Sequence, residues 1–217
     1  MNSEQARFNM IEQQVRPWNV LDPKVLELLA HVRREDFVPV AYKALAFADL
    51  EIPLACGQSM LVPRLEARLL QDLALQGHER VLEIGTGSGY MAALLAKCSA
   101  DVTTIELHAE LAGAARNALQ RAGAPNVQVR NEDASVMSVK EDRYDAIVLS
   151  GSLPQVPDNL LQMLKPGGRL AAIIGEEPVM RATFITRIGK DEFVTRHPWD
   201  ANAPRLMNFP EQSHFKF

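Results

Sequence analysis

The chain has few cysteines, few aromatic residues and no long hydrophobic run. Its two cysteines, Cys56 and Cys98, lie far apart and in no C-x-x-C or metal-ligand spacing, so we expect free thiols in a reducing compartment. The longest segment without a charged residue, 84–96, spans 13 residues, whereas a membrane-spanning helix needs ~20. The first residues also lack the basic and apolar regions of a signal peptide. We therefore expect a cytoplasmic protein with no membrane segment.

Neither sign of charge dominates the sequence. The 27 acidic and 23 basic residues leave a formal net charge of −4, which offers no field to draw the chain onto nucleic acid or an anionic membrane. The five histidines are scattered, and no HExxH or clustered Cys/His pattern predicts a metal site. We expect no nucleic-acid partner and no metal. The hydrophobic content of 47% is that of a globular protein.

The chain divides into an N-terminal helical segment, residues 1–76, and a main domain, residues 77–217. In the first segment, apolar residues at helical spacing predict helices over about 25–32 and 63–76, and the stretch 52–63 between them predicts a loop or short irregular strands. From residue 80, strands alternate with helices, which favours a mostly parallel sheet with right-handed crossovers. The expected strands are 80–84, 102–105, 126–130, 144–149 and 169–174. The runs 183–188 and 192–196, joined by Gly189-Lys190-Asp191, predict an antiparallel C-terminal hairpin.

Three glycines at alternate positions mark the most informative segment, which reads VLEIGTGSGY over residues 81–90. They follow an expected strand and precede an expected helix, where bare main chain permits a tight turn and close approach of a ligand. A plain strand–helix connection, with Thr86 and Ser88 as caps, is the alternative. A dinucleotide fingerprint needs its third glycine where this chain has Tyr90, and no lysine follows in P-loop register. Both classical nucleotide motifs are therefore disfavoured.

Three acidic residues surround this turn at the expected carboxyl edge of the sheet. Glu106 ends the second strand, where a carboxylate can accept both hydroxyls of a ribose, and Asp133 follows the third, where it can accept from an adenine amine. Glu83 lies inside an apolar strand, and a ligand ammonium or an internal partner would keep it ionised. A solvated Glu106 and an Asx turn at Asp133 are the alternatives. Together the residues indicate a ligand with adenine, ribose and ammonium groups but no pyrophosphate, which matches S-adenosylmethionine.

With these residues in place, the chain resembles the protein-L-isoaspartate O-methyltransferase family over most of its length. The resemblance is carried by REDFVP (34–39), Gly57-Gln58 ahead of Pro63, RVLEIGTGSGY (80–90), Glu106, Tyr144-Asp145-Ala146-Ile147 and LKPGGRL (164–170). It implies an α/β fold: a Rossmann-like, seven-stranded methyltransferase sheet with an antiparallel C-terminal hairpin and a helical segment over the site. It also implies methyl transfer from S-adenosylmethionine to isoaspartyl carboxylates in damaged proteins.

Residue by residue, the resemblance implies a donor site and an acceptor loop. The turn of Gly85, Thr86, Gly87, Ser88 and Gly89 would hold the methionine part of S-adenosylmethionine, Glu106 the ribose and Asp133 the adenine. The expected donor site also includes Leu107 and Ala134, which follow these two acids. It further includes Glu83, which would lie near the ammonium group of S-adenosylmethionine. The family usually has Gly-Asp-Gly around the adenine acid, where this chain has Glu132-Asp133-Ala134.

The acceptor side departs from the family. The family's loop typically reads Gly-Gln-Thr-Ile-Ser-x-Pro, whereas this chain has Gln58 and Ser59 followed by Leu61 at the position of the catalytic serine. Leucine cannot donate a hydrogen bond to a carboxylate, and the loss of one such bond costs about 1.5–3 kcal/mol. The segment Ser150–Leu153 also replaces an alanine-rich stretch. Two alternatives follow: a methyltransferase for a different acceptor, such as a small molecule, or an S-adenosylmethionine-binding protein without catalysis. The sequence does not determine the oligomeric state.

Overall fold

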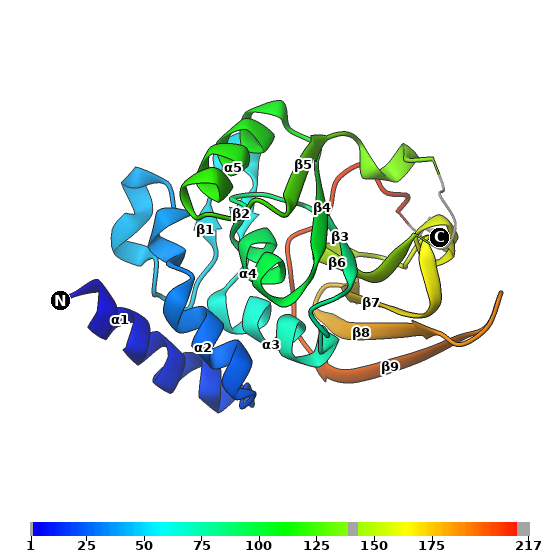
Figure 1. The fold of residues 1–217 in the computed structure, drawn as a ribbon, viewed down its shortest axis with the longest axis horizontal. Helices are drawn as coiled ribbons and strands as arrows, with labels where there is room; N and C mark the ends of the chain where they lie inside the picture. Colours follow the sequence, from blue (N-terminus) through cyan, green and yellow to red (C-terminus); the bar gives the residue numbers. More distant parts are fainter. Residues whose placement is uncertain (1, 139–142, 212–217) are drawn as a thin grey trace, which may run out of the picture.

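A seven-stranded sheet forms the centre of the computed structural model, which describes residues 2–138 and 143–211 (Figure 1). The strands lie in the order β5-β4-β3-β6-β7-β8-β9. Their bounds are β3 Arg80–Ile84, β4 Asp101–Glu106, β5 Val127–Asn131, β6 Tyr144–Leu153, β7 Leu164–Glu176, β8 Val179–Arg187 and β9 Phe193–Asp200. The strands β3 to β7 are parallel, β8 runs antiparallel to β7, and β9 runs antiparallel to β8. The predicted sheet and its C-terminal hairpin are confirmed.

The helices agree with the predicted pattern but differ at their ends. Their bounds are α1 Ser3–Met10, α2 Pro23–His31, α3 Pro63–Leu73, α4 Tyr90–Cys98, α5 Ala109–Arg121 and α6 Asp158–Gln162. The carboxylate of Asp22 caps α2 by accepting a hydrogen bond from the Lys24 amide at 2.8 Å. Helix α3 ends three residues before the predicted Gln76, because Ala74 adopts a left-handed conformation with φ 52°. The predicted loop 52–63 contains a short antiparallel pair, β1 Ile52–Pro53 and β2 Ser59–Met60.

Two hydrophobic clusters cover the two faces of the sheet, because side chains alternate along each strand. Val81 of β3 belongs to a cluster with residues of α2, α3 and α4, such as Leu29, Leu69 and Leu94. Its neighbour Leu82 belongs to a second cluster. The N-terminal helices therefore share a core with the sheet, and in Figure 1 they lie beside α3 and α4.

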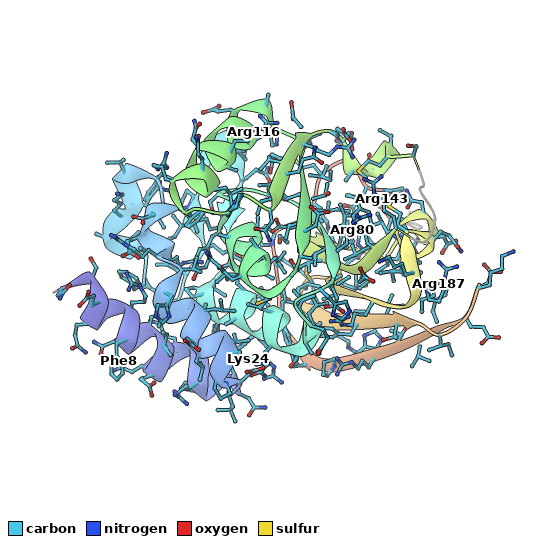
Figure 2. All side chains as sticks on the ribbon, viewed as in Figure 1. Phe8, Lys24, Arg80, Arg116, Arg143 and Arg187 are labelled. Carbon is cyan, nitrogen blue, oxygen red and sulfur yellow. The ribbon has the colours of Figure 1, made fainter. Side chains whose placement is uncertain are left out.

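The outer face of the N-terminal helices carries both apolar and charged side chains. Figure 2 shows Phe8 of α1 and Lys24 of α2 at the outer edge of the N-terminal helices, where both are exposed. Among the described residues, every helix is too short or too polar to cross a bilayer.

The strand order reverses between β3 and β6. From β3 the chain continues outward through β4 and β5 on one side, and it then returns to place β6 on the other side of β3. The loops after β3 and β6 therefore diverge, which opens a crevice at their carboxyl ends. In open α/β sheets this is the usual position of a ligand.

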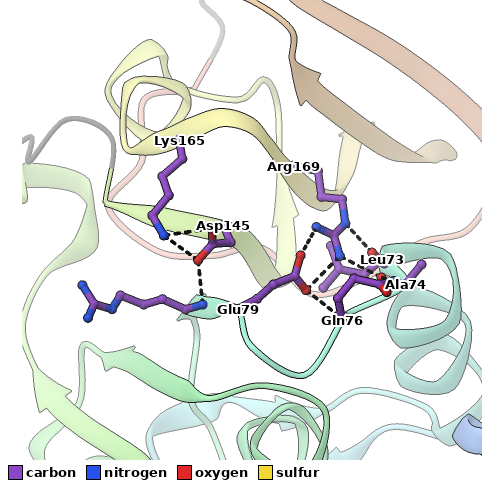
Figure 3. A network of polar contacts seen from close by, with 8 residues as sticks. Leu73, Ala74, Gln76, Glu79, Asp145, Lys165 and Arg169 are labelled. Carbon is purple, nitrogen blue, oxygen red and sulfur yellow. Dashed lines mark hydrogen bonds and ion pairs between the residues drawn. The ribbon is translucent and has the colours of Figure 1, made fainter.

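A polar network holds the opposite, amino-terminal edge of the sheet (Figure 3). Arg169 donates to the Leu73 and Ala74 carbonyls at the end of α3 and forms an ion pair with Glu79 at 2.6 Å. Burial raises the pKa of Glu79, but the hydrogen bonds from Arg169 and the Gln76 amide outweigh it, so the pKa lies below its usual value. The arginine of the LKPGGRL motif thus joins α3 to the sheet, far from the crevice.

This network predicts unequal effects for two charge removals. Arg169→Met leaves the buried carboxylate of Glu79 without its cation, and we expect a loss of about 3 kcal/mol in the free energy of unfolding. Lys165→Met is the control, since Lys165 pairs with Asp145 nearer to solvent and should cost less than about 1 kcal/mol. Urea denaturation of both variants measures the difference. Equal losses would contradict the assigned role of Arg169.

Candidate functional site

The crevice at the strand reversal is a lined cleft that collects most of the predicted site residues. Those that line it are Gln58, Ser59, Gly85, Gly87, Glu106, Leu107, Asp133 and Ala134. Leu61, Glu83, Thr86, Ser88 and Gly89 do not line it. His108, which follows the acid at the end of β4, and Ser150, from the segment that departs from the family, also line it. The remaining lining residues were not expected from the sequence: Ile84, Ile105, Glu132, Pro204, Arg205, Leu206, Met207 and Phe209.

The glycine turn needs its glycines for conformation and for space. Gly85, Gly87 and Gly89 have φ values of 93°, 52° and 87°, in the left-handed region that other residues rarely adopt. A Cβ on Gly85 would lie 2.9 Å from Leu206 Cδ2, and one on Gly89 would lie 3.3 Å from the Ala115 Cβ. The turn therefore presents bare main chain to the cleft and packs α4 closely against α5.

Glu106 braces the turn from the end of β4. Its carboxylate accepts hydrogen bonds from the Gly87 amide at 2.8 Å and the His108 amide at 3.0 Å. The side chain lines the cleft although the residue is only 5% exposed. An acid in this position is fixed in orientation and retains lone pairs for a ligand's hydroxyl groups.

Asp133 occupies the neighbouring corner of the cleft. One carboxylate oxygen accepts from the Ser135 amide at 2.9 Å and hydroxyl at 2.6 Å, and the other accepts from the Asn208 amide at 2.8 Å. The hydrogen bond from the Ser135 side chain is the main reason why the pKa of Asp133 lies below its usual value. Asp133 thus forms the Asx turn that the sequence allowed and also lines the cleft.

Glu83 lies beneath the cleft floor rather than in it. The residue is fully buried, and its carboxyl oxygens accept from Thr104 Oγ1 and Ser150 Oγ, both at 2.7 Å. Burial raises the pKa of Glu83 to about 8, in spite of these two hydrogen bonds. The internal partners of this acid are therefore hydroxyl groups.

Leu61 in the acceptor loop is directed into the protein. The residue is 4% exposed and belongs to the core shared with the N-terminal helices. Its carbonyl accepts from Arg34 at 2.7 Å, and the same guanidinium pairs with Glu66 of α3. Gln58 and Ser59 line the cleft, and the Ser59 hydroxyl donates to the carboxylate of Glu51 at 3.0 Å.

One side of the cleft is formed by residues 201–209, a segment after β9 that we call the C-terminal strap. The Ser152 amide of β6 donates to the Pro204 carbonyl at 2.7 Å, and the Leu206 amide returns a bond to the Ser152 carbonyl at 3.0 Å. Asn208 of the strap bonds Asp133, and the amide of Gln58 bonds the Met207 sulfur at 3.3 Å. No periodicity or motif marks the strap in the sequence. In the sequence, the end of β9 is indicated only by Pro204 and by the absence of a strand-like alternation of apolar and polar residues.

Within residues 2–138 and 143–211, no group of three His, Cys, Asp or Glu side chains is placed to hold a metal ion. Both cysteines are free in the structure.

Comparisons with known proteins identify one family. The family model of protein-L-isoaspartate(D-aspartate) O-methyltransferase matches residues 5–199. A protein-L-isoaspartate O-methyltransferase of Rhodopseudomonas palustris is 39% identical over 91% of this chain and 91% of its own length. One of Myxococcus xanthus is 43% identical over 72% of this chain and 74% of its own length.

A solved structure shares the fold. It is a putative protein-L-isoaspartate O-methyltransferase of Plasmodium falciparum in complex with S-adenosyl-L-homocysteine. The two folds superpose with a TM-score of 0.77 at 19% identity, over 95% of this chain and 98% of the other.

The burial of Leu61 generates a prediction about stability. Leu61→Ser removes core packing and buries a hydroxyl group, so we expect the free energy of unfolding to fall by about 2–4 kcal/mol. Leu61→Met keeps the volume and should cost less than about 1.5 kcal/mol. Chemical denaturation tests both variants, and a Leu61→Ser protein as stable as the parent would show that position 61 does not pack in the core.

Proposed function

The chain belongs to the protein-L-isoaspartate(D-aspartate) O-methyltransferase family, and on this premise we propose that it transfers a methyl group from S-adenosylmethionine to isoaspartyl carboxylates in damaged proteins. The observation that carries the proposal is the convergence of the glycine turn, Glu106 and Asp133 on one cleft at the strand reversal.

The cleft fits the donor group by group. Gly85 and Gly87 line the cleft, and because they carry no side chain their main chain can face the methionine part. Glu106 is held in orientation to accept the ribose hydroxyls, and Asp133 to accept the adenine amine. Leu107 and Ala134 provide apolar surface between these two acids. Glu83 lies below the cleft floor and reaches the cleft only through its hydrogen bond with Ser150.

The protein's part in the reaction is mainly alignment. The bound donor supplies a methyl group already activated by its sulfonium. An isoaspartyl carboxylate is already ionised at neutral pH, so no general base is needed. Holding the two groups in near-attack geometry can supply about 7–11 kcal/mol. Gln58 and Ser59 line the side of the cleft from which the acceptor would enter.

We further propose that the protein acts in the cytoplasm on protein or peptide acceptors. The two free cysteines support a reducing compartment. Protein substrates are supported by the names of the relatives, which act on isoaspartate in proteins.

The substrate assignment predicts turnover of an isoaspartyl peptide. The parent protein with S-adenosylmethionine should convert the isoaspartyl peptide to its methyl ester, while the matched peptide with normal aspartate remains unmodified. Release of S-adenosylhomocysteine measures the rate. Donor binding without transfer would instead favour a different acceptor, which the missing hydroxyl at position 61 would then explain.

The donor assignment predicts weaker binding in Glu106→Ala. The loss of hydrogen bonds donated to a charged acceptor costs about 1.5–3 kcal/mol, so the Kd for S-adenosylmethionine should rise roughly 10- to 100-fold. Glu110→Ala removes an exposed carboxylate outside the cleft and serves as the control. Calorimetric titration measures both, and equal affinities of the two variants would refute the ribose contact.

A further inference from the structure

We propose that Ser150 of β6 is the acceptor-side catalytic hydroxyl of this protein, donating a hydrogen bond to the acceptor carboxylate in place of the hydroxyl that position 61 lacks. The inference rests on the proposed function. The resemblance places the hydroxyl that binds the acceptor carboxylate in the acceptor loop, whereas this inference places it on strand β6.

The position of Ser150 supports this role. It lines the cleft together with Gln58 and Ser59 of the acceptor loop. Its carbonyl oxygen lies 3.3 Å from the point where a Cβ of Gly85 would be, so Ser150 adjoins the turn at the methionine end of the donor site. Ser150 therefore adjoins the glycine turn and shares one cleft with the acceptor loop.

A bulge in β6 directs this residue. β6 pairs with β7 at Val148 and Ala171, and the pairing resumes at Ser152 and Ile173. Three residues of β6, 149–151, thus oppose one residue of β7, and the pairing of β6 with β3 ends at Leu149. Bulges of this kind re-aim side chains beside active sites.

The partner of Ser150 is a buried acid rather than a solvated one. Ser150 Oγ lies 2.7 Å from Glu83 Oε1, and Glu83 is joined through Thr104 to Thr86. Of these four residues, only Ser150 lines the cleft. Within this network of four residues, Ser150 is therefore the one that can contact a substrate in the cleft.

The protonation state of Glu83 makes Ser150 a donor. Burial raises the pKa of Glu83 to about 8, and the charged groups that bear on it are Glu66 of α3, itself paired with Arg34, and Glu106 of β4. In the structure Ser150 Oγ donates to Glu83 Oε1. The raised pKa favours the protonated acid at neutral pH, and a protonated Glu83 reverses this bond: it donates to Ser150 Oγ and leaves the serine hydrogen free to point into the cleft. Glu83 thus acts as a positioning residue.

Ser59 is the competing hydroxyl, and its partner disfavours it. Ser59 donates to the exposed carboxylate of Glu51, which brings a negative charge close to an anionic acceptor. Like charges at short range repel, whereas the neutral Glu83 behind Ser150 adds no such repulsion.

The transfer step itself leaves Ser150 unchanged. An oxygen of the acceptor carboxylate forms a bond to the methyl carbon, the carbon–sulfur bond breaks, and its electron pair stays on the sulfur of S-adenosylhomocysteine. No proton is exchanged. The Ser150 hydrogen bond holds the carboxylate in line for the attack.

The test compares kcat for an isoaspartyl peptide in serine variants. Ser150→Ala should lower kcat about 10- to 100-fold while the Kd for S-adenosylmethionine stays within about twofold. Ser150→Thr should restore much of the loss, and Ser59→Ala should lower kcat less than Ser150→Ala does. Ser99→Ala, which removes a buried hydroxyl at the end of α4, controls for general destabilisation.

The outcomes separate the two proposals. An inactive parent refutes the proposed function and this inference with it. An active parent whose Ser150→Ala variant keeps its kcat refutes the inference alone, and so does a loss that Ser150→Thr fails to restore.

The pH profile tests Glu83. In the parent, kcat/KM should fall at alkaline pH as Glu83 ionises and draws the serine hydrogen inward. The Glu83→Gln variant, whose amide still donates to Ser150, should show a flat profile. An identical decline in both proteins would overturn the role of Glu83.

Discussion

One buried arginine connects the parts of this protein that must meet at the cleft. Arg34 is fully buried and donates to the Ala46 carbonyl at 3.1 Å and the Leu61 carbonyl at 2.7 Å. Its guanidinium pairs with Glu66 of α3 and lies 4.9 Å from the centroid of the Tyr90 ring of α4. A buried charge is tolerated only when its donors are paired, so these four contacts depend on one another. Their common effect is to fix the acceptor loop against the helix that follows the glycine turn.

The amino edge of the sheet contributes to stability, whereas the carboxyl edge forms the cleft. At the amino edge, Arg169 and Glu79 join α3 to β7 with fully paired groups. At the carboxyl edge, the cleft keeps groups whose hydrogen-bonding capacity is only partly used, such as Glu106 and Ser150. Two motifs of the family resemblance therefore have different roles: LKPGGRL stabilises the fold, whereas RVLEIGTGSGY shapes the cleft.

The C-terminal strap links elements that are far apart in the sequence. It pairs with β6 at Ser152, bonds Asp133 through Asn208 and reaches Gln58 through Met207. The expected adenine corner and the acceptor loop thus share one neighbour. A short segment with no secondary structure of its own closes the cleft, because the end of β6 offers it free backbone groups.

The sequence by itself determined what local chemistry controls. Glycines in a tight turn, apolar residues at helical spacing and the alternation of strands with helices act over a few residues. The turn at Gly85–Gly89, the helix α2 and the parallel sheet were therefore predictable. The placement of Glu106 and Asp133 at one edge follows from parallel strands alone. Tertiary structure decided the rest, because those contacts join residues far apart in the chain. Leu61 is buried in the core shared with the N-terminal helices, where Arg34 donates to its carbonyl. Ser150 meets Glu83 across two neighbouring strands, and the strap crosses the cleft from the far end of the sheet. Such pairings depend on packing and burial, which no spacing of residue types encodes.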